Sequence, residues 1–197
     1  MTAQFSDIVY YKQKKYELAA ANSEGLFDPL SLGLKPYPCC TACWNGFLIE
    51  YRVAYRKFQL KNLLINLYDY EKKEKTIQKP IAINGILPET YEDFRGFDTI
   101  YQNVRLTIPY TGKILIARNF IRWLYVHMGY HSAWKYKDVV ELQFQEGRLI
   151  QEEDLSGEMK DLRSRYGLGS KPNCPDDEIR DRISEKMELL DKAFYGQ

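Results

Sequence analysis

The sequence predicts an α+β protein with a mainly antiparallel β-sheet built from hairpins, one helix near residues 119–128, and two C-terminal helices packed on one side. Three observations support this fold class. Short runs rich in Tyr, Val, Ile and Phe recur through most of the chain and are separated by turn residues. Apolar residues fall at helical spacing once in the middle and twice in the tail. With 197 residues, 45% of them hydrophobic, the chain can bury a sizeable core.

The N-terminal region predicts a β-hairpin. Residues 8–11 and 15–20 are short and β-prone, and Lys12-Gln13-Lys14 separates them, although this turn lacks the usual Gly or Asn. Residues 21–38 contain several Gly and Pro and predict a long structured loop.

Two longer strands are expected next. Residues 44–54 and 55–68 are rich in Tyr, Phe, Val and Leu, and Lys61-Asn62 is the expected turn inside the second run. The mixed-charge stretch at residues 71–79 predicts a solvated loop.

The middle of the chain predicts a second antiparallel pair followed by a helix. Residues 104–109 and 113–117 alternate as strands around a Thr-Gly turn. Asn119 then stands where a helix N-cap belongs, and Gly129 stands at the position that follows a helix C-terminus. The apolar stripe of this helix is Ile121, Leu124, Tyr125 and Met128.

The last quarter of the chain predicts one hairpin and two helices. Residues 136–144 and 148–150 flank Glu146-Gly147 as a hairpin. Ser156 is the expected cap of a short helix, and Pro175 takes the first position of a longer one. The stripe of the longer helix is Ile179, Ile183, Met187, Leu190 and Phe194.

This pattern gives a domain organisation. Residues 1–155 form a β-rich body, and residues 156–197 form a helical segment packed on the same domain.

Composition narrows the classes of function. The net charge is +1, with +5 over residues 1–125 and −4 over residues 126–197, and neither part has the basic excess that nucleic-acid binding leaves. The N-terminus shows no secretory h-region, and the chain nowhere runs to about 18 uninterrupted apolar residues. We therefore expect a cytoplasmic protein with no membrane segment, in which the four cysteines are thiols.

One chemical hypothesis is a zinc site. Cys40 and Cys43 have C-x2-C spacing, and His127 and His131 have H-x3-H spacing, so the ligand types of a Cys2His2 site are present. Against it, the two pairs lie far apart in sequence, and Gly129 is expected to end the helix between the histidines. The simpler alternative is that the cysteines act as small apolar residues that pack at the start of a strand.

A cysteine nucleophile or redox site is a further alternative. Cys39, Cys40 and Cys43 would supply the thiol, with His127 or His131 as its base. The cysteines lead into an expected β-strand, however, whereas a catalytic cysteine favours a helix N-terminus. The sequence contains no G-x-S-x-G, P-loop or G-x-G-x-x-G motif, so acyl-transfer and nucleotide chemistries lack their usual residues.

Aromatic and polar residues in the loops give the favoured functional hypothesis. They indicate a small cytosolic binding or protein-interaction domain without catalytic activity, which needs no cofactor and takes a protein or a small ligand as its partner. The alternative is a zinc-dependent enzyme or zinc-stabilised domain, and a cysteine-based hydrolase or redox enzyme is third. The candidate binding residues are Trp44, Phe47, Arg122, Tyr130, His131, Trp134 and Tyr136.

Overall fold

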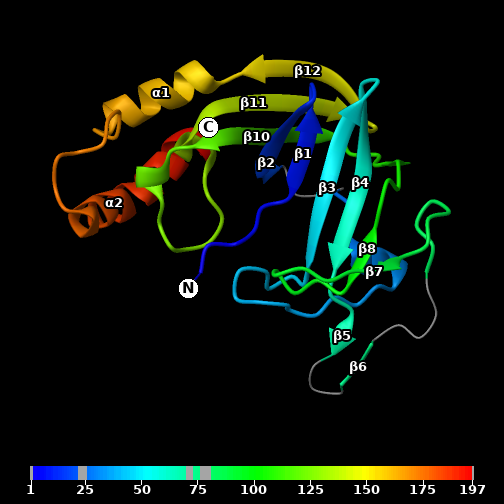
Figure 1. The fold of residues 1–197 in the computed structure, drawn as a ribbon. Helices are drawn as coiled ribbons and strands as arrows, with labels where there is room; N and C mark the ends of the chain where they lie inside the picture. Colours follow the sequence, from blue (N-terminus) through cyan, green and yellow to red (C-terminus); the bar gives the residue numbers. More distant parts are fainter. Residues whose placement is uncertain (1, 22–25, 70–72, 76–80, 197) are drawn as a thin grey trace.

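The structure is a computed structural model that describes residues 2–21, 26–69, 73–75 and 81–196. Its fold is α+β, with a large, mixed, mostly antiparallel 10-stranded sheet and two C-terminal helices, which confirms the predicted class (Figure 1). The elements are β1 (Ile8–Tyr11), β2 (Lys14–Ala21), the 3-10 helix η1 (Pro29–Leu32), β3 (Phe47–Ala54), β4 (Lys57–Ile65), β5 (Tyr68–Asp69), β6 (Glu74–Lys75), β7 (Glu89–Thr90), β8 (Thr99–Tyr101), β9 (Leu106–Thr107), β10 (Gly112–Phe120), the 3-10 helices η2 (Arg122–Leu124) and η3 (Ala133–Lys135), β11 (Tyr136–Gln145), β12 (Arg148–Asp154), α1 (Ser156–Arg165) and α2 (Asp176–Tyr195).

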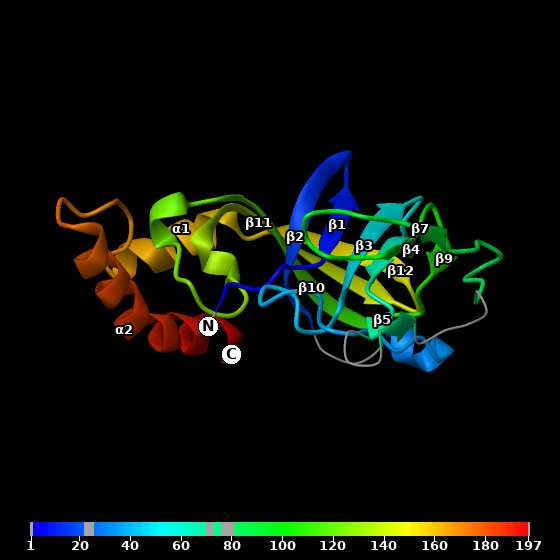
Figure 2. The ribbon, with the colours of Figure 1, turned by 60° about the horizontal axis from the view of Figure 1, so that its bottom comes forward.

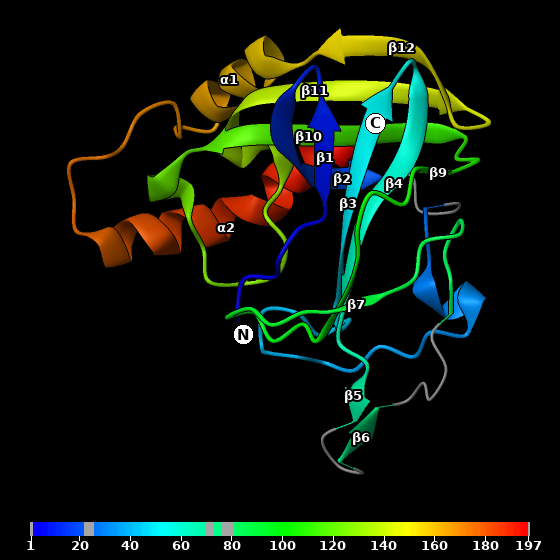
Figure 3. The same cartoon turned by 45° about the vertical axis from the view of Figure 1, so that its right-hand side comes forward.

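The main sheet closes on itself. Its strand order is β12-β11-β10-β2-β1-β3-β4-β8-β7, and β12 also pairs with β4, so the strands from β4 to β12 in this order form a barrel. Two backbone hydrogen bonds of 2.8 Å, from Phe58 to Gly147 and from Leu149 to Arg56, hold the closure. In Figure 3, β1, β3 and β4 cross in front of β10 and β11. One pairing, β1 with β3, is parallel.

The barrel interior is the largest core. Alternate residues along each strand point into the barrel and fill it, because successive side chains of a strand point to opposite faces. Phe58 lies at its centre, with ring centroids 4.7 Å from Tyr51 and 4.8 Å from Phe144. Gly147 at the closure has φ +74°, and a Cβ there would lie 2.2 Å from the Ile108 carbonyl oxygen, so a larger residue would displace the β11–β12 turn.

Three hairpins confirm the predicted runs and show which turns join them. Lys12 and Gln13 both have positive φ, as do Tyr55 and Arg56 between β3 and β4, so both turns have type I′ geometry without Gly or Asn at their centres. Glu146-Gly147 turns β11 into β12 as predicted.

The prediction of a turn at Lys61-Asn62 is wrong. Both residues lie inside β4, where the register against β3 shifts between Glu50 and Tyr51 and leaves Lys61 as the extra residue of a β-bulge. The side chain of Asn62 donates a 2.7 Å hydrogen bond to Glu50, which holds the two strands together at the bulge.

The pairing expected between residues 104–109 and 113–117 is also wrong. β9 pairs with β4, whereas β10 lies between β2 and β11. The strands are real, but their partners are distant in sequence. Most of the predicted charged loop at residues 71–79 lies outside the described residues, except that β6 pairs with β5 in a separate two-stranded sheet.

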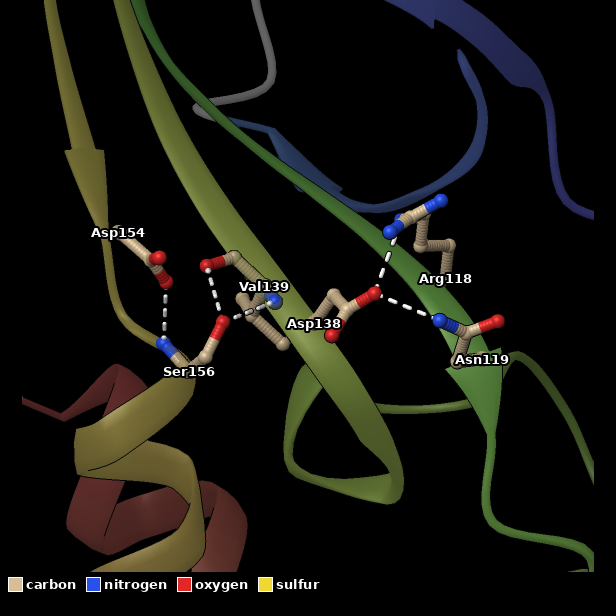
Figure 4. Close-up of polar contacts among 6 residues, drawn as sticks. All are labelled: Arg118, Asn119, Asp138, Val139, Asp154 and Ser156. Carbon is tan, nitrogen blue, oxygen red and sulfur yellow. Dashed lines mark hydrogen bonds and ion pairs between the residues drawn. The ribbon is translucent and has the colours of Figure 1, made fainter.

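The helix predicted near residues 119–128 does not form. β10 continues through Asn119 to Phe120, and only the short 3-10 helix η2 follows. Asn119 has φ +60°, and its side-chain amide donates a 2.6 Å hydrogen bond to Asp138 on β11 instead of capping a helix. Arg118 meets the same carboxylate at 2.9 Å, so two side chains of β10 are tied to the neighbouring strand (Figure 4).

The two C-terminal helices confirm the prediction for the tail, with a different cap on the first. Ser156 is the first residue of α1, and its amide donates to the Asp154 side chain at 2.9 Å. Its hydroxyl instead accepts a 3.1 Å hydrogen bond from the Val139 amide, which ties the start of α1 to β11 (Figure 4).

The helices form a second core on one side of the barrel. Figure 2 shows both helices beside one end of the barrel, where β10 and β11 extend toward them. Outward residues of these strands, such as Ala117 and Val139, share a cluster with Leu162 of α1 and Ile183 of α2. In the part of the chain that the structure describes, neither helix has the length and apolar composition needed to span a bilayer.

Candidate functional site

The N-terminal segment brings together the two loops that the sequence singles out. The amide of Gln4 donates to the Gly129 carbonyl at 2.8 Å, and that of Phe5 donates to the Ala42 carbonyl at 2.8 Å. The side chain of Gln4 also accepts from the Trp44 amide at 3.3 Å. The cysteine loop and the loop after residue 128 therefore meet across residues 4 and 5.

A cleft of about 240 Å³ lies where these segments meet the end of β2. Three consecutive small residues of β2 form one wall, and aromatic and polar side chains form the others. The pairing of β2 with β10 shifts register and skips Ala19. The lining residues are Phe5, Asp7, Leu18, Ala19, Ala20, Ala21, Cys43, Asn45, Phe47 and Tyr130.

Asp7 is the charged residue of this cleft. It precedes β1, and its Oδ1 accepts a 2.8 Å hydrogen bond from the Ile49 amide, where the parallel pairing with β3 begins. Protein surrounds its carboxyl group, and the residue keeps some exposure at the cleft. Burial raises the pKa of Asp7 to about 7, against the opposing effect of the Ile49 amide.

The charge of Asp7 contributes to a raised pKa at two tyrosines. The Tyr51 hydroxyl is buried in the barrel core, and burial, then the Asp7 charge, hold its pKa well above the usual range, against the opposing effect of the Phe27 backbone. Burial raises the pKa of Tyr130 as well, followed by the charges of Asp7 and Cys43, while Asn45 acts in the opposite direction. The charge of Asp7 therefore acts on two tyrosine hydroxyl groups, both of which are partly or fully buried.

The cysteine loop adds a cluster of thiols beside the cleft. The Cys39 thiol donates to the Cys43 carbonyl oxygen at 4.0 Å, and the Cys43 thiol donates to the Phe47 carbonyl oxygen at 3.4 Å. The interaction between the two side chains lowers the pKa of Cys43, although burial opposes this, and raises the pKa of Cys39. Cys40 and Cys43 pair across a tight turn through a 3.0 Å backbone hydrogen bond. Gly46 ends this loop with φ +71°, where a Cβ would lie 2.1 Å from the Tyr37 carbonyl oxygen.

The structure separates the predicted binding residues into two groups. Phe47 and Tyr130 line the cleft, and Trp44 is next to it in sequence and 58% exposed. Trp134 and Tyr136 are buried, and they pack in the helical core rather than in a binding loop. The Trp134 indole donates to Asp191 of α2 at 2.8 Å, and the Tyr136 hydroxyl donates to Glu17 of β2 at 2.6 Å.

Arg122 and the histidines lie elsewhere. Arg122 is exposed on η2, and His127 is exposed with its Nδ1 2.8 Å from the Tyr125 hydroxyl. His131 packs on Phe120 with ring centroids 4.7 Å apart and the two rings tilted by 33°. Its burial, followed by the charge of Lys135, lowers its pKa to about 4, so its ring is neutral at pH 7.

The ligand set of the zinc hypothesis is not assembled. Among the residues that the structure describes, no group of three or more His, Cys, Asp or Glu side chains is placed to hold a metal ion. His131 packs instead on aromatic rings, as described above, and its Nδ1 is buried without a hydrogen-bond partner. The sequence spacing alone gave no information on where these rings point.

A larger hollow of about 650 Å³ lies outside the barrel near Leu155 and Phe194, and it is a weaker candidate. None of its polar lining residues is buried, and Glu141 is neutralised by Lys113 at 2.8 Å. The smaller cleft, by contrast, contains the Asp7 carboxyl group, which protein surrounds and which forms no ion pair among the described residues.

Asp7 and Tyr51 are the residues that sequence reasoning missed. A signal for Asp7 was present, because Asp7, Val9 and Tyr11 share strand parity and the latter two are buried in the barrel. Tyr51 gave no such signal, because tyrosine in a strand is common.

The fold and the cleft define a class, an α+β protein with a closed mixed sheet and an acidic, aromatic-lined cleft at its side. No protein-family model, curated protein or solved structure matches the chain.

Proposed function

We propose that this chain is a non-catalytic binding protein that holds a small organic amine in the cleft beside Asp7. The observation that carries the proposal is an acidic side chain, shielded from bulk water, that lines a cavity and forms no ion pair among the described residues. A buried carboxylate without a counter-charge is unfavourable, and a ligand cation would remove that cost.

The other walls of the cleft suit the same ligand. The rings of Phe5, Phe47 and Tyr130 line it, and aromatic rings attract an ammonium group through their faces. Its volume is below the roughly 300–1,000 Å³ of sites that enclose drug-sized ligands, which favours a ligand of few atoms. The Asn45 side chain supplies a further polar group for orientation.

The proposal includes a cytosolic location. A reducing compartment keeps the four cysteines as the free thiols that the structure contains.

Isothermal calorimetry with matched probes tests amine binding. Benzylamine and benzyl alcohol have nearly the same shape, so the charge of the amine is the main difference between them. We expect benzylamine to bind at least roughly tenfold more tightly, which corresponds to about 1.4 kcal/mol. The affinity should fall from about pH 8 to about pH 5.5, as Asp7 takes up a proton through its pKa of about 7.

Asp7→Asn separates the role in binding from the role in folding. The asparagine keeps a side-chain oxygen to accept from Ile49 but loses the charge, so the preference for the amine should disappear while the fold remains. Asp161→Asn makes the same chemical change on an exposed face of α1 and should leave binding unchanged. Equal affinity of the wild type for the amine and the alcohol would refute the proposal.

A further inference from the structure

One wall of the cleft is the end of β2, which has a neighbouring strand on one side only. β1 pairs with β2 up to Glu17, and the Leu18 amide still donates to the Asp7 carbonyl at 2.7 Å. Further along, Ala20 and Ala21 pair with β10, and among the described residues no strand pairs with them on the side of β1. The edge of β2 beside Asp7 is therefore open.

The residues of this edge leave its backbone accessible. Residues 19–21 are all alanines, so no side chain longer than a methyl group covers the main chain, and all three are half-buried. Ala19 is the extra residue of the bulge against β10, and such a residue is left unpaired in the ladder. An open strand edge of this kind can take up an extended peptide through main-chain hydrogen bonds.

On the β3 side of the cleft, side chains already bind the backbone. The Ile49 amide donates to Asp7 Oδ1 at 2.8 Å, and the Phe47 carbonyl accepts from the Cys43 thiol at 3.4 Å. Both side chains line the cleft, so the groups that face it from β3 are satisfied within the protein. Main-chain partners for a ligand therefore come from β2.

Asp7 stands where the open edge of β2 begins. Its Oδ1 binds Ile49, and among the described residues no hydrogen bond or ion pair involves its Oδ2. A cation at this carboxylate and a main chain beside the alanines are found together in one kind of ligand. In a peptide with a free N-terminus, the ammonium group is followed directly by amide groups.

We infer that the cleft binds the N-terminus of a peptide, with the α-ammonium group at Asp7 and the following main chain extended along the open edge of β2. The inference rests on the proposed function, because it names the class of amine. A peptide that starts at Asp7 runs toward Ala21, parallel to β2. The cavity of about 240 Å³ favours a small first residue such as Gly, Ala or Ser, and the rest of the peptide leaves past Ala21.

Isothermal calorimetry of the full chain with matched peptides tests both parts of the inference. The tripeptide Gly-Ala-Ala amide should bind at least roughly tenfold more tightly than its N-acetylated form, which lacks the charge. Alternate amides of an extended chain point to opposite sides. Methylation of the first and of the second amide nitrogen should therefore differ in effect by at least roughly fivefold, the value of one hydrogen bond. Asp7→Asn should lose the advantage over the acetylated peptide, and Asp161→Asn should keep it.

Hydrogen exchange of the wild type locates the peptide without any variant. Saturating Gly-Ala-Ala amide should slow exchange at one or more amides of residues 19–21 by at least roughly tenfold, because those amides gain a main-chain partner. Saturating benzylamine should leave the same amides unchanged, because it has no amide group to pair with them.

The two proposals fail in different ways. Benzylamine that binds more tightly than benzyl alcohol, together with equal affinities of the two methylated peptides and unchanged exchange at residues 19–21, would overturn the peptide assignment and leave amine binding intact. Equal affinities for benzylamine and benzyl alcohol would refute amine binding itself, and the peptide assignment with it.

Discussion

The cleft and the helical core each contain an ionisable side chain in surroundings of low polarity, and the two differ in what lies beside that group. Asp7 faces a cavity, and its pKa is raised to about 7. Lys135 is fully buried under α2, where burial lowers its pKa to about 8 against the opposing charge of Asp191. The first arrangement leaves room for a ligand cation, and the second lowers stability without offering a site.

The contacts of Lys135 support this distinction. Its Nζ lies 3.7 Å from the Met187 sulfur and 5.2 Å from the centre of the Trp134 ring, so a thioether and an aromatic ring lie beside the amine. Arg163 closes the same region by donating to the Trp134 and Tyr136 carbonyls at 2.7 and 2.9 Å. The helical core is thus filled by protein groups on all sides.

The largest expected effect separates the two tryptophans. Trp134→Ala should cost ~3–5 kcal/mol of unfolding free energy, because the indole is fully buried and bonded to Asp191. Trp44→Ala should change stability by less than about 0.5 kcal/mol, because its side chain is mostly exposed. Urea denaturation of both variants measures this, and equal losses would contradict the separation of core from cleft.

Asp7 should give stability an unusual pH dependence. Its pKa is higher in the folded protein than the ordinary 3.8, so the folded state holds more protons between about pH 4 and 7. The contribution of Asp7 is therefore fully present at low pH and is lost as pH rises through about 7, by ~2–4 kcal/mol. Denaturation across this range should show the decline in the wild type relative to Asp7→Asn, and parallel curves would show that Asp7 is not shielded.

Lys135→Met should stabilise the protein at neutral pH. The amine has a folded pKa of about 8 and an ordinary value of 10.5, so charging it costs free energy in the folded state. We expect a gain of ~2 kcal/mol at pH 7 that narrows as pH rises between 8 and 10.5. A loss of stability at pH 7 would show that the ammonium group has compensating partners.

His131 should produce the smallest effect, in the opposite direction from Asp7. Its folded pKa is lowered to about 4, so the unfolded chain takes up a proton first and stability falls as pH drops from 6.5 toward 4. The loss should be about 1 kcal/mol, because the ring is only half-buried. His131→Phe should remove this component, and His127→Gln, at an exposed position, should retain it.

The local parts of the fold were predictable from sequence, and the distant pairings were not. Alternation identified the strands of three hairpins, although the turn at Tyr55-Arg56 was not predicted, and apolar stripes identified both C-terminal helices. The parallel pairing of β1 with β3 and the closure of β12 on β4 join residues far apart, and strand periodicity does not encode such partners.

The failed helix shows how a local signal is overridden. Asn119 followed by apolar residues at helical spacing has the pattern of a capped helix. In the structure, the ladder with β11 extends to Phe120, and Asp138 binds the side chains of Arg118 and Asn119. Tertiary pairing with β11 overrides the local helix signal here.

The candidate site was predictable only in part, because the sequence does not show which distant elements meet in space. Phe47 and Tyr130 were predicted as binding residues and Cys43 as a metal ligand or reactive thiol, and the three meet at the cleft. Trp134 was predicted as an aromatic residue of a binding loop, but its neighbours in space are helices that follow much later in the chain.

The most direct test of the central claim is the pKa of the Asp7 carboxyl, measured by carbon NMR with and without benzylamine. We predict a value near 7 in the free protein and a clear decrease when the amine is present, because a nearby cation favours the carboxylate. A pKa near 7 that does not move in saturating amine, or a free value near the ordinary 3.8, would contradict it.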